Sequence, residues 1–144
     1  MPRRSRLVAP FVLALLAACA HKAPPPDPVD AGGPLRVEYP PESVDIQGPM
    51  PRDVAMSTLE ANRAAFASCV PRGAVANSGG RVTVFLRLTV GPEGRVRKAV
   101  LHESDAHDRS IDRCMVQRVK SMQFPNGPSQ ATSVVSTRVV VSNP

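Results

Sequence analysis

The stretch from residue 80 to residue 125 constrains the fold more than any other part of the chain. Residues 81–90 alternate between apolar and polar side chains, which is the period of a strand with one buried face. The buried set is Val82, Val84, Leu86, Leu88 and Val90. A turn with glycine at both ends, residues 91–94, then reverses the chain into a second strand over residues 95–102, where adjacent apolar residues predict a bulge. The pattern therefore predicts a β-hairpin.

An amphipathic helix is predicted directly after this hairpin. Asp105, Asp108 and Ser110 are candidate N-caps. Apolar side chains then recur at helical spacing at Ile111, Met115, Val119 and Met122, with Cys114 beside them. The helix has to stop before Pro125, and Phe124 is expected to anchor its exit in the core.

The first 18 residues are typical of a secretory signal, with arginines followed by a short apolar run. The run is too short for a stable membrane span. Its last residues, Leu16-Ala17-Ala18-Cys19, resemble the lipobox of bacterial lipoproteins. That resemblance implies cleavage before Cys19, lipidation of Cys19, and, with Ala20 next, an outer-membrane anchor facing the periplasm. The alternative is an ordinary signal with an accidental cysteine.

Residues 19–53 are predicted to be the lipidated cysteine and a disordered spacer, because residues 20–53 hold nine prolines and almost no apolar periodicity. Residues 37–39 are the one place in it where a short edge strand could form. The folded domain is then expected over residues 54–144. That part carries twelve basic and six acidic residues, which favours acidic partners, although a solvated surface would show the same balance.

Two further elements complete the predicted domain. A first helix begins at Asp53 or Ser57 and continues to Pro71, and a third strand covers residues 132–141. The order is α-β-β-α-β, so we expect an α+β fold in which two helices cover one face of a three-stranded antiparallel sheet. Cys69 and Cys114 lie on the inner faces of the two helices, and in an oxidising compartment they are expected to form a disulfide. Two buried free thiols are the alternative.

The order of these motifs is similar to the carboxy-terminal domain of TonB-type transducers, and in particular to the AgmX/PglI type of gliding-motility proteins, which carries a cysteine in each helix. The matching positions are Gly80, Val82, Phe85, Leu88, Val90, Gly94, Val96, Val100, Ser104, Ile111, Asp112, Val119, Phe124 and Pro125. The resemblance covers about residues 59–141. It implies that an extended partner peptide adds as a strand to the sheet edge. TonB transducers keep an uncleaved membrane helix, whereas this chain has a lipobox in its place.

These patterns predict a non-enzymatic, lipid-anchored envelope module that binds a protein or peptide partner. The resemblance implies a TonB-like transport or gliding-motility complex as its setting. The third strand returns after the helix and is expected to be the edge that binds the partner, through Val134, Ser136, Arg138 and Val140. Nucleic acid is not expected as a partner, because the chain is predicted to be exported and has few aromatic residues for stacking.

Other interpretations remain open. A structural or cell-wall-associated lipoprotein, without a role in energy transduction, would have the same spacer and basic domain. An enzyme or metal site could use His102, Glu103, Asp105 and His107, but their spacing matches no known metal motif, and solvated loop residues would give the same cluster. We therefore expect no catalytic residue, metal or cofactor.

Overall fold

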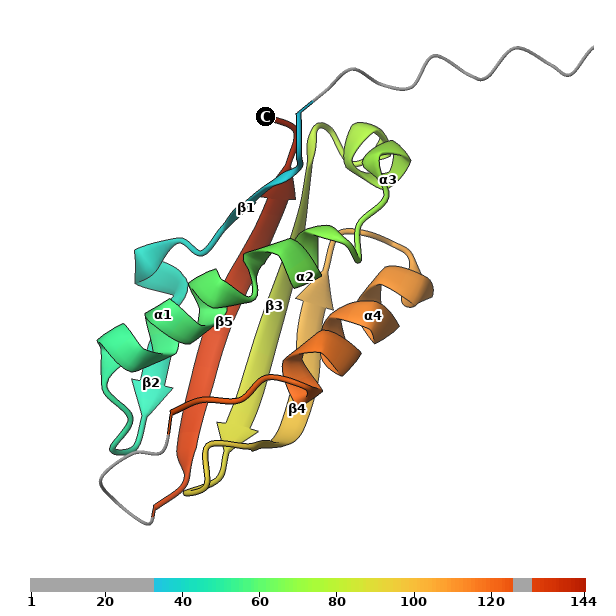
Figure 1. Ribbon diagram of the computed structural model, residues 1–144. Helices are drawn as coiled ribbons and strands as arrows, with labels where there is room; N and C mark the ends of the chain where they lie inside the picture. Colours follow the sequence, from blue (N-terminus) through green and yellow to red (C-terminus); the bar gives the residue numbers. More distant parts are fainter. Residues whose placement is uncertain (1–32, 126–130) are drawn as a thin grey trace, which may run out of the picture. The chain divides into compact units, whose positions relative to one another are not determined.

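A computed structural model describes residues 33–125 and 131–144, which form a mixed α+β fold around one antiparallel sheet (Figure 1). The sheet has five strands in the order β1-β5-β3-β4, and β2 also pairs with β5. The strands are β1 (Arg36–Glu38), β2 (Asp45–Gln47), β3 (Arg81–Val90), β4 (Val96–Ser104) and β5 (Ser133–Ser142). The predicted α+β class is confirmed, whereas the sheet is larger than the three strands expected.

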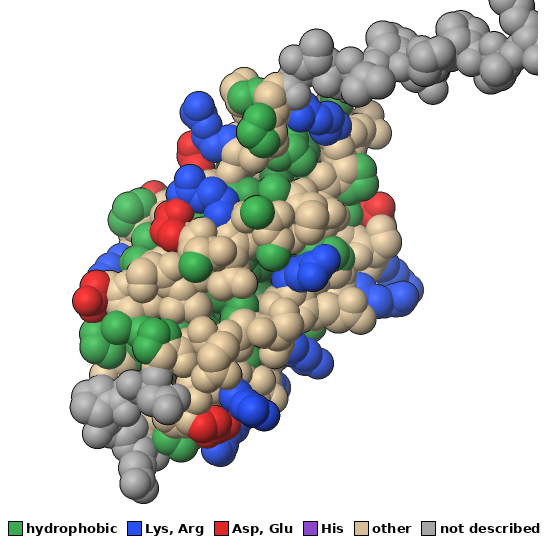
Figure 2. All heavy atoms as spheres, viewed as in Figure 1, with side chains coloured by type: hydrophobic (Ala, Val, Ile, Leu, Met, Phe, Trp, Pro, Cys, Tyr) green, Lys and Arg blue, Asp and Glu red, His purple; other side chains and the backbone are tan. Residues whose placement is uncertain are grey.

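The α-helices gather on one side of this sheet, where α1, α2 and α4 lie across its strands (Figure 1). Figure 2 shows this helix-bearing side, on which basic side chains are scattered between apolar and uncharged surface. The helical elements are the 3-10 turn η1 (Pro41–Ser43) and the helices α1 (Arg52–Ala61), α2 (Arg63–Ala67), α3 (Arg72–Asn77) and α4 (Arg109–Lys120).

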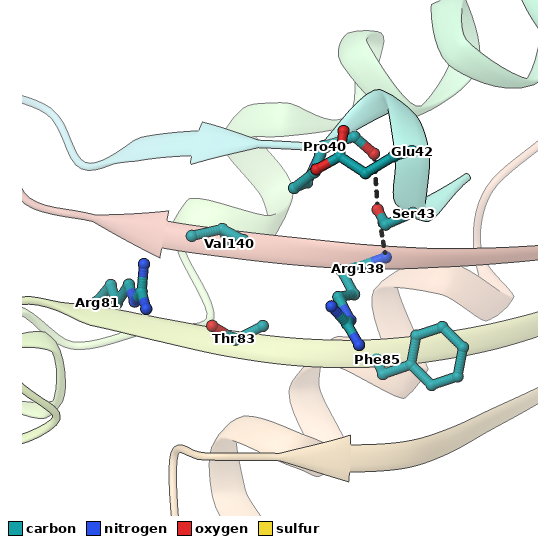
Figure 3. A pocket seen from close by; sticks show the side chains of 8 residues that line it. All are labelled: Pro40, Glu42, Ser43, Arg81, Thr83, Phe85, Arg138 and Val140. Atoms are coloured by element: carbon teal, nitrogen blue, oxygen red, sulfur yellow. Dashed lines mark hydrogen bonds between the residues drawn. The ribbon is translucent and has the colours of Figure 1, made fainter.

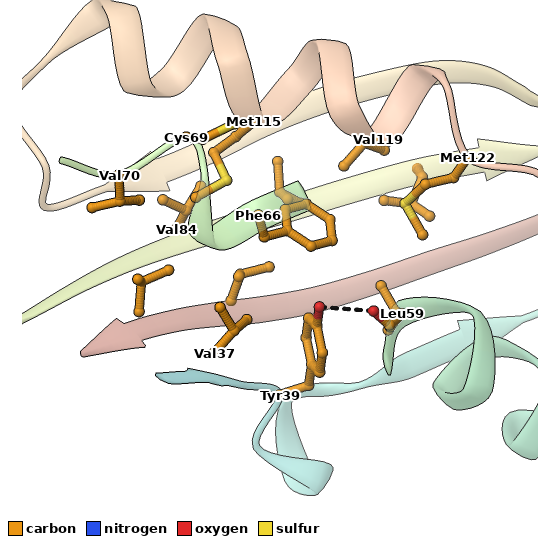
Figure 4. Close-up of a cluster of buried hydrophobic side chains, with 14 of the residues drawn as sticks. Val37, Tyr39, Leu59, Phe66, Cys69, Val70, Val84, Met115, Val119 and Met122 are labelled. Carbon is orange, nitrogen blue, oxygen red and sulfur yellow. Dashed lines mark hydrogen bonds between the residues drawn. The ribbon is translucent and has the colours of Figure 1, made fainter. Parts of the chain in front are cut away.

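The core lies between the helices and the apolar face of the sheet (Figure 4). The five residues predicted to be buried in β3 are at most 1% exposed, because strand alternation places all of them on the covered side. Phe66 of α2 and Met115 of α4 are fully buried against them, as is Phe124. The expected anchoring of the α4 exit by Phe124 is therefore confirmed.

The hairpin between β3 and β4 also forms as predicted. Gly91 N donates to Arg95 O at 2.8 Å, and Gly94 takes a positive φ of 80° that favours glycine. The register between the two strands shifts between Phe85 and Leu86 and again between Thr89 and Val90. The predicted bulge in the second strand therefore occurs twice in β4, once before and once after the apolar residues Ala99, Val100 and Leu101.

The first predicted helix is interrupted, in contrast to the single helix expected up to Pro71. It divides at Asn62, whose φ of −98° and ψ of 7° leave the helical region, and whose side chain donates to Thr58 O at 2.8 Å. Asparagine favours such local side-chain bonds over helix continuation. Pro71 does not end helical structure, because it is the N-cap of α3. A proline at a helix start removes no hydrogen bond.

The spacer prediction for residues 36–52 is wrong. These residues form β1, η1 and β2, so the domain boundary lies before β1 and not at residue 53. Val37 and Val44 are 0% and 2% exposed, and Tyr39 OH donates to Leu59 O at 2.8 Å inside the core. The prolines in this segment are placed outside its two strands, where they remove no ladder hydrogen bond. The strand suggested at residues 37–39 forms at residues 36–38.

The prediction that the third strand is an edge is also wrong. β5 pairs with β3 along its whole length on one side. On its other side β1 pairs with residues 140–142 and β2 with residues 134–136. Ser43 Oγ accepts a hydrogen bond from Arg138 N at 3.2 Å in the interval between them. β5 therefore lies inside the sheet, because the segment before α1 supplies the strands that cover it.

The predicted disulfide joins Cys69 and Cys114, with their Cα atoms 5.6 Å apart. Cys114 lies in α4, whereas Cys69 follows α2 and is not inside a helix. Asp108 is confirmed as the N-cap of α4, since its side chain accepts from Ser110 N at 2.7 Å. The signal sequence and Cys19 lie outside the described residues, and no helix within those residues is long and apolar enough to span a membrane.

Candidate functional site: the uncovered face and free edge of the sheet

The face of the sheet opposite the helices carries the candidate site. In β3 the exposed or half-buried positions alternate with the core positions, so they all point away from the helices. They are Arg81, Thr83, Phe85, Arg87 and Thr89. We call this side the open face. Its strands come from distant parts of the chain, which is why no single motif in the sequence identifies it.

Strand register places partners from β5 and β4 beside these residues. Phe85 pairs with Arg138 of β5 and with Glu103 of β4. Thr89 pairs with Lys98 of β4, and Arg81 with Ser142. Cross-strand partners share one face of a sheet, so basic side chains of three strands project from the open face.

A hollow of about 380 Å³ lies where the open face meets η1 (Figure 3). Its lining comes from η1 with Pro40, from β3 and from β5: Pro40, Glu42, Ser43, Arg81, Thr83, Phe85, Arg138 and Val140. Ser43 holds this wall in place, because its Oγ donates to Pro40 O at 2.7 Å and accepts from Arg138 N. Arg81 and Arg138 both line this hollow and are exposed to solvent.

Two further hollows continue across the same face. One shares Thr83, Phe85 and Arg138 with the first and reaches the end of β4, where it is bordered by Glu103, Ser104, Asp105 and His107. The other is lined by Arg87, Thr89, Lys98, Val100 and His102. The rings of Phe85 and His102 lie 5.6 Å apart between them. The open face therefore combines an aromatic centre with shallow hollows that contain basic groups.

The basic side chains of the open face are not neutralised within the described part of the chain. The ion pairs there join Arg63 to Glu60, and Arg97 to Glu93 at 2.9 Å. The hydrogen bond from Arg97 holds the pKa of the Glu93 carboxyl below its usual value. Neither pair involves the open-face residues Arg81, Arg87, Lys98 or Arg138, so these four are available to an external anion.

The edge of the sheet at β4 is the second feature of the site. β4 pairs with β3 on one side. On the other side, within the described residues, only the bridge between Arg95 and Gln123 is formed, and it precedes the first residue of β4. The outward backbone groups of β4 itself have no described strand to pair with, whereas those of β5 are taken by β1 and β2.

The four residues predicted to bind a partner, Val134, Ser136, Arg138 and Val140, do share one face of β5. They belong to the open face and not to an edge. Arg138 is exposed, whereas Ser136 is buried between neighbouring strands. The prediction missed Phe85 and Arg87, although their alternation with the buried positions of β3 was the available signal.

The four residues considered for an enzyme or metal site, His102, Glu103, Asp105 and His107, do not all lie in one hollow. Asp105 Oδ1 accepts from Thr83 N at 2.6 Å, and Asp105 N donates to Thr83 O at 3.1 Å, so this residue extends the pairing of β3 with β4. His102 packs on Phe85 and lines a different hollow from His107. Residues 33–125 and 131–144 contain no group of three or more His, Cys, Asp or Glu side chains placed to hold a metal ion.

Comparison with known proteins adds no assignment to this geometry. No family model, curated protein or solved structure matches the chain significantly. The inference of function therefore depends on the open face, the free edge of β4 and the motifs of the sequence.

Proposed function

We propose that the protein is a non-enzymatic, lipid-anchored interaction module of the bacterial envelope, which binds an extended segment of a partner protein by strand addition at β4. The observation that carries this proposal is the free edge of β4 next to a well-packed sheet. An added strand gains main-chain hydrogen bonds from such an edge, and neighbouring side chains give specificity.

We propose the contact at β4 and not at β5, because the strand pairs of β5 are already formed on both sides. A partner strand could reach β5 only by displacing β1 and β2. The segment that contains these two strands buries Val37, Tyr39 and Val44 in the core. Removing three such side chains from the core would expose a large apolar area. Addition at β4 displaces no strand among residues 33–125 and 131–144, so it is the less costly mode.

Details of β4 limit what can add there. Between its two register shifts, β4 pairs regularly with β3 only from Lys98 to Leu101. An edge strand with bulges and charged residues resists pairing with the same strand of another copy of the protein. Ala99 and Leu101 point toward the core side, where α4 covers the sheet, and Lys98 and Val100 belong to the open face. The partner segment is therefore expected to pair over about four residues.

The family resemblance supports the same proposal. β3, β4, α4 and β5 follow each other in the order expected for a TonB-type carboxy-terminal domain, with β3 between β4 and β5. The lipobox at residues 16–19 supplies the proposed anchor in place of a membrane helix. We propose on this basis that the domain is TonB-like and is held at the outer membrane facing the periplasm.

The anchor is tested by the mass of the mature protein and its membrane fractionation. The wild-type chain should begin at Cys19 with attached acyl chains, whereas Cys19→Ser should give an unlipidated product that leaves the membrane fraction. A mature wild-type protein without acyl mass on Cys19 would contradict the anchor while leaving the binding proposal intact.

Strand addition is tested by photo-crosslinking in intact cells followed by hydrogen exchange. Benzoylphenylalanine in place of Lys98 should crosslink one partner segment, and the same group in place of Arg113 on α4 is the control. A synthetic peptide of that segment should then slow the exchange of β4 amides by roughly tenfold or more in a soluble form of the chain. Slowed exchange confined to other elements would refute addition at β4.

A further inference from the structure

Four basic side chains form a row along the open face, which we call the basic row: Arg81, Arg138, Arg87 and Lys98. Arg138 is the cross-strand partner of Phe85, and Lys98 is the cross-strand partner of Thr89. Along the direction of β3, the four basic side chains therefore lie at the positions of residues 81, 85, 87 and 89. At about 3.3 Å per residue, successive members are separated by about 13, 7 and 7 Å along the strand direction.

These spacings match the period of an extended peptide. Side chains on one face of an extended chain recur every two residues, or about 7 Å. The basic row thus corresponds to the first, fifth, seventh and ninth residues of a strand laid along the open face. The long Arg and Lys side chains can reach sideways across the strand spacing of about 4.8 Å to contact a single chain.

Charge complementarity favours an acidic ligand. No member of the basic row takes part in an ion pair within the part of the chain that the structure describes. The charges of residues 33–125 and 131–144 sum to fourteen basic and ten acidic residues, so the described part is basic as a whole. Exposed, unpaired basic groups attract carboxylates with less desolvation than buried ones.

The groups around the basic row distinguish a peptide from a uniform polyanion. Val140 and Phe85 line the hollow between Arg81 and Arg138, and Val100 lines the hollow that holds Lys98. Glu42 of η1 stands at the margin of the first hollow, and Glu103 of β4 stands at the margin of the hollow that reaches the end of β4. The margins would repel a ligand with charge along its whole length, whereas apolar residues between carboxylates would contact the apolar lining.

We infer that the open face binds an extended acidic segment of a partner protein, with carboxylates on alternate residues that contact the basic row. This surface lies on the face of the sheet and not along the free edge of β4, although Lys98 belongs to β4 and lies close to both. The inference holds whether or not a strand adds at that edge. Each contact is an exposed charge pair, so the affinity arises from several weak contacts and falls with added salt.

The probe for this inference is a nine-residue peptide with glutamate at the first, fifth, seventh and ninth positions, valine at the third and serine elsewhere. A peptide of the same composition with its glutamates divided between both faces is the control. Fluorescence anisotropy with a soluble form of the full mature chain should show tighter binding of the first peptide, and added salt should weaken it.

Substitutions in the basic row identify the surface. Arg138→Gln and Arg87→Gln should each weaken binding of the first peptide by roughly threefold, the effect of one exposed charge pair. Arg113→Gln on α4 removes the same charge from the helix-bearing side and should leave binding unchanged. All three positions are exposed, so the fold is expected to be retained, as circular dichroism would verify.

Three results would overturn the inference. One is equal binding of the two peptides, and another is an equal loss with Arg113→Gln, which would indicate attraction by net charge alone. The third is binding to vesicles of anionic lipid that depends on Arg138 while neither peptide binds, which would assign the surface to a membrane. Exchange of β4 amides, measured with the same peptide, separates this contact from strand addition.

Discussion

Tyr39 offers a direct test of whether the segment before α1 belongs to the domain. It follows β1, is 5% exposed, and donates its hydroxyl to Leu59 O in α1 at 2.8 Å (Figure 4). Its ring meets Phe66 of α2 edge to face, with centroids 6.1 Å apart. Tyr39→Phe removes the hydroxyl and preserves the ring contact, so it isolates the hydrogen bond between this segment and α1.

The expected loss of stability follows from the partners of Leu59 O. That oxygen also accepts from Asn62 N at 3.0 Å, so the substitution leaves no buried acceptor without a partner. The free energy of unfolding should therefore fall by about 1 kcal/mol, the ordinary net value of a hydrogen bond. For a domain of this size that corresponds to a fall of roughly 4 °C in Tm. Tyr39→Ala also removes the ring and should cost about 3–5 kcal/mol.

The same residue predicts a dependence on alkaline pH. Burial raises the pKa of the Tyr39 phenol above its usual value near 10, the nearby Glu60 carboxylate raises it further, and Arg63 opposes the shift. Because the pKa is higher in the folded state, the stabilisation is fully present below pH 10 and is lost as the pH rises beyond it. Tyr39→Phe should show a weaker loss of stability above pH 10 than the wild type.

Urea unfolding followed by circular dichroism measures the stability of both proteins across pH. Tyr39 is the only tyrosine and the chain has no tryptophan, so phenolate absorbance reports this one side chain. In the native protein, phenolate should form only well above pH 10 or together with unfolding. An unchanged unfolding midpoint in Tyr39→Phe, together with native titration near pH 10, would show that the segment before α1 is not packed in the core.

Three other substitutions follow from local geometry. Replacing both Cys69 and Cys114 with alanine removes a disulfide between residues 45 positions apart, and it should lower the free energy of unfolding by about 4 kcal/mol, or Tm by roughly 15 °C. Reductant should lower the Tm of the wild type by the same amount. A wild-type Tm that does not respond to reductant would contradict the disulfide. Gly94→Ala puts a Cβ against backbone at a φ of 80° and should cost roughly 2 kcal/mol in urea unfolding, whereas Gly73→Ala in α3 meets no atom within 4 Å and should not destabilise. Asp108→Ala should lower Tm at neutral pH, because hydrogen bonds from Ser110 hold the pKa of the Asp108 carboxyl below its usual value near 4. The stability that this carboxylate contributes is therefore present above about pH 4 and is lost as the pH falls through the lower pKa of the folded state. The Tm values of the wild type and Asp108→Ala should converge in acid.

Local patterns in the sequence determined the hairpin, α4 and the core side of β3. The alternation in residues 81–90 predicts which side chains are buried, because strand geometry requires only neighbours along the chain. Asp108 as a cap and Gly94 in the turn were likewise predictable, since each acts within a few residues. The cysteine pair could be proposed because it was the only pair left after Cys19.

Only the tertiary structure decided which strand is an edge. Alternation tells which face of a strand is buried but not which strands lie beside it. β1 and β2 have three residues each, which is too short for a periodic pattern, and prolines surround them. Their pairing with β5 joins residues that are roughly a hundred positions apart in the sequence, such as Val37 with Val141 and Asp45 with Ser136.

The open face depends on the tertiary structure for the same reason. Arg81 and Arg87 come from β3, Lys98 from β4 and Arg138 from β5, and in the sequence they are separate basic residues in unrelated segments. The sequence alone determined that each projects from its strand on the polar side. Strand order and register, which are set by nonlocal hydrogen bonds and by core packing, bring them into one row beside Phe85.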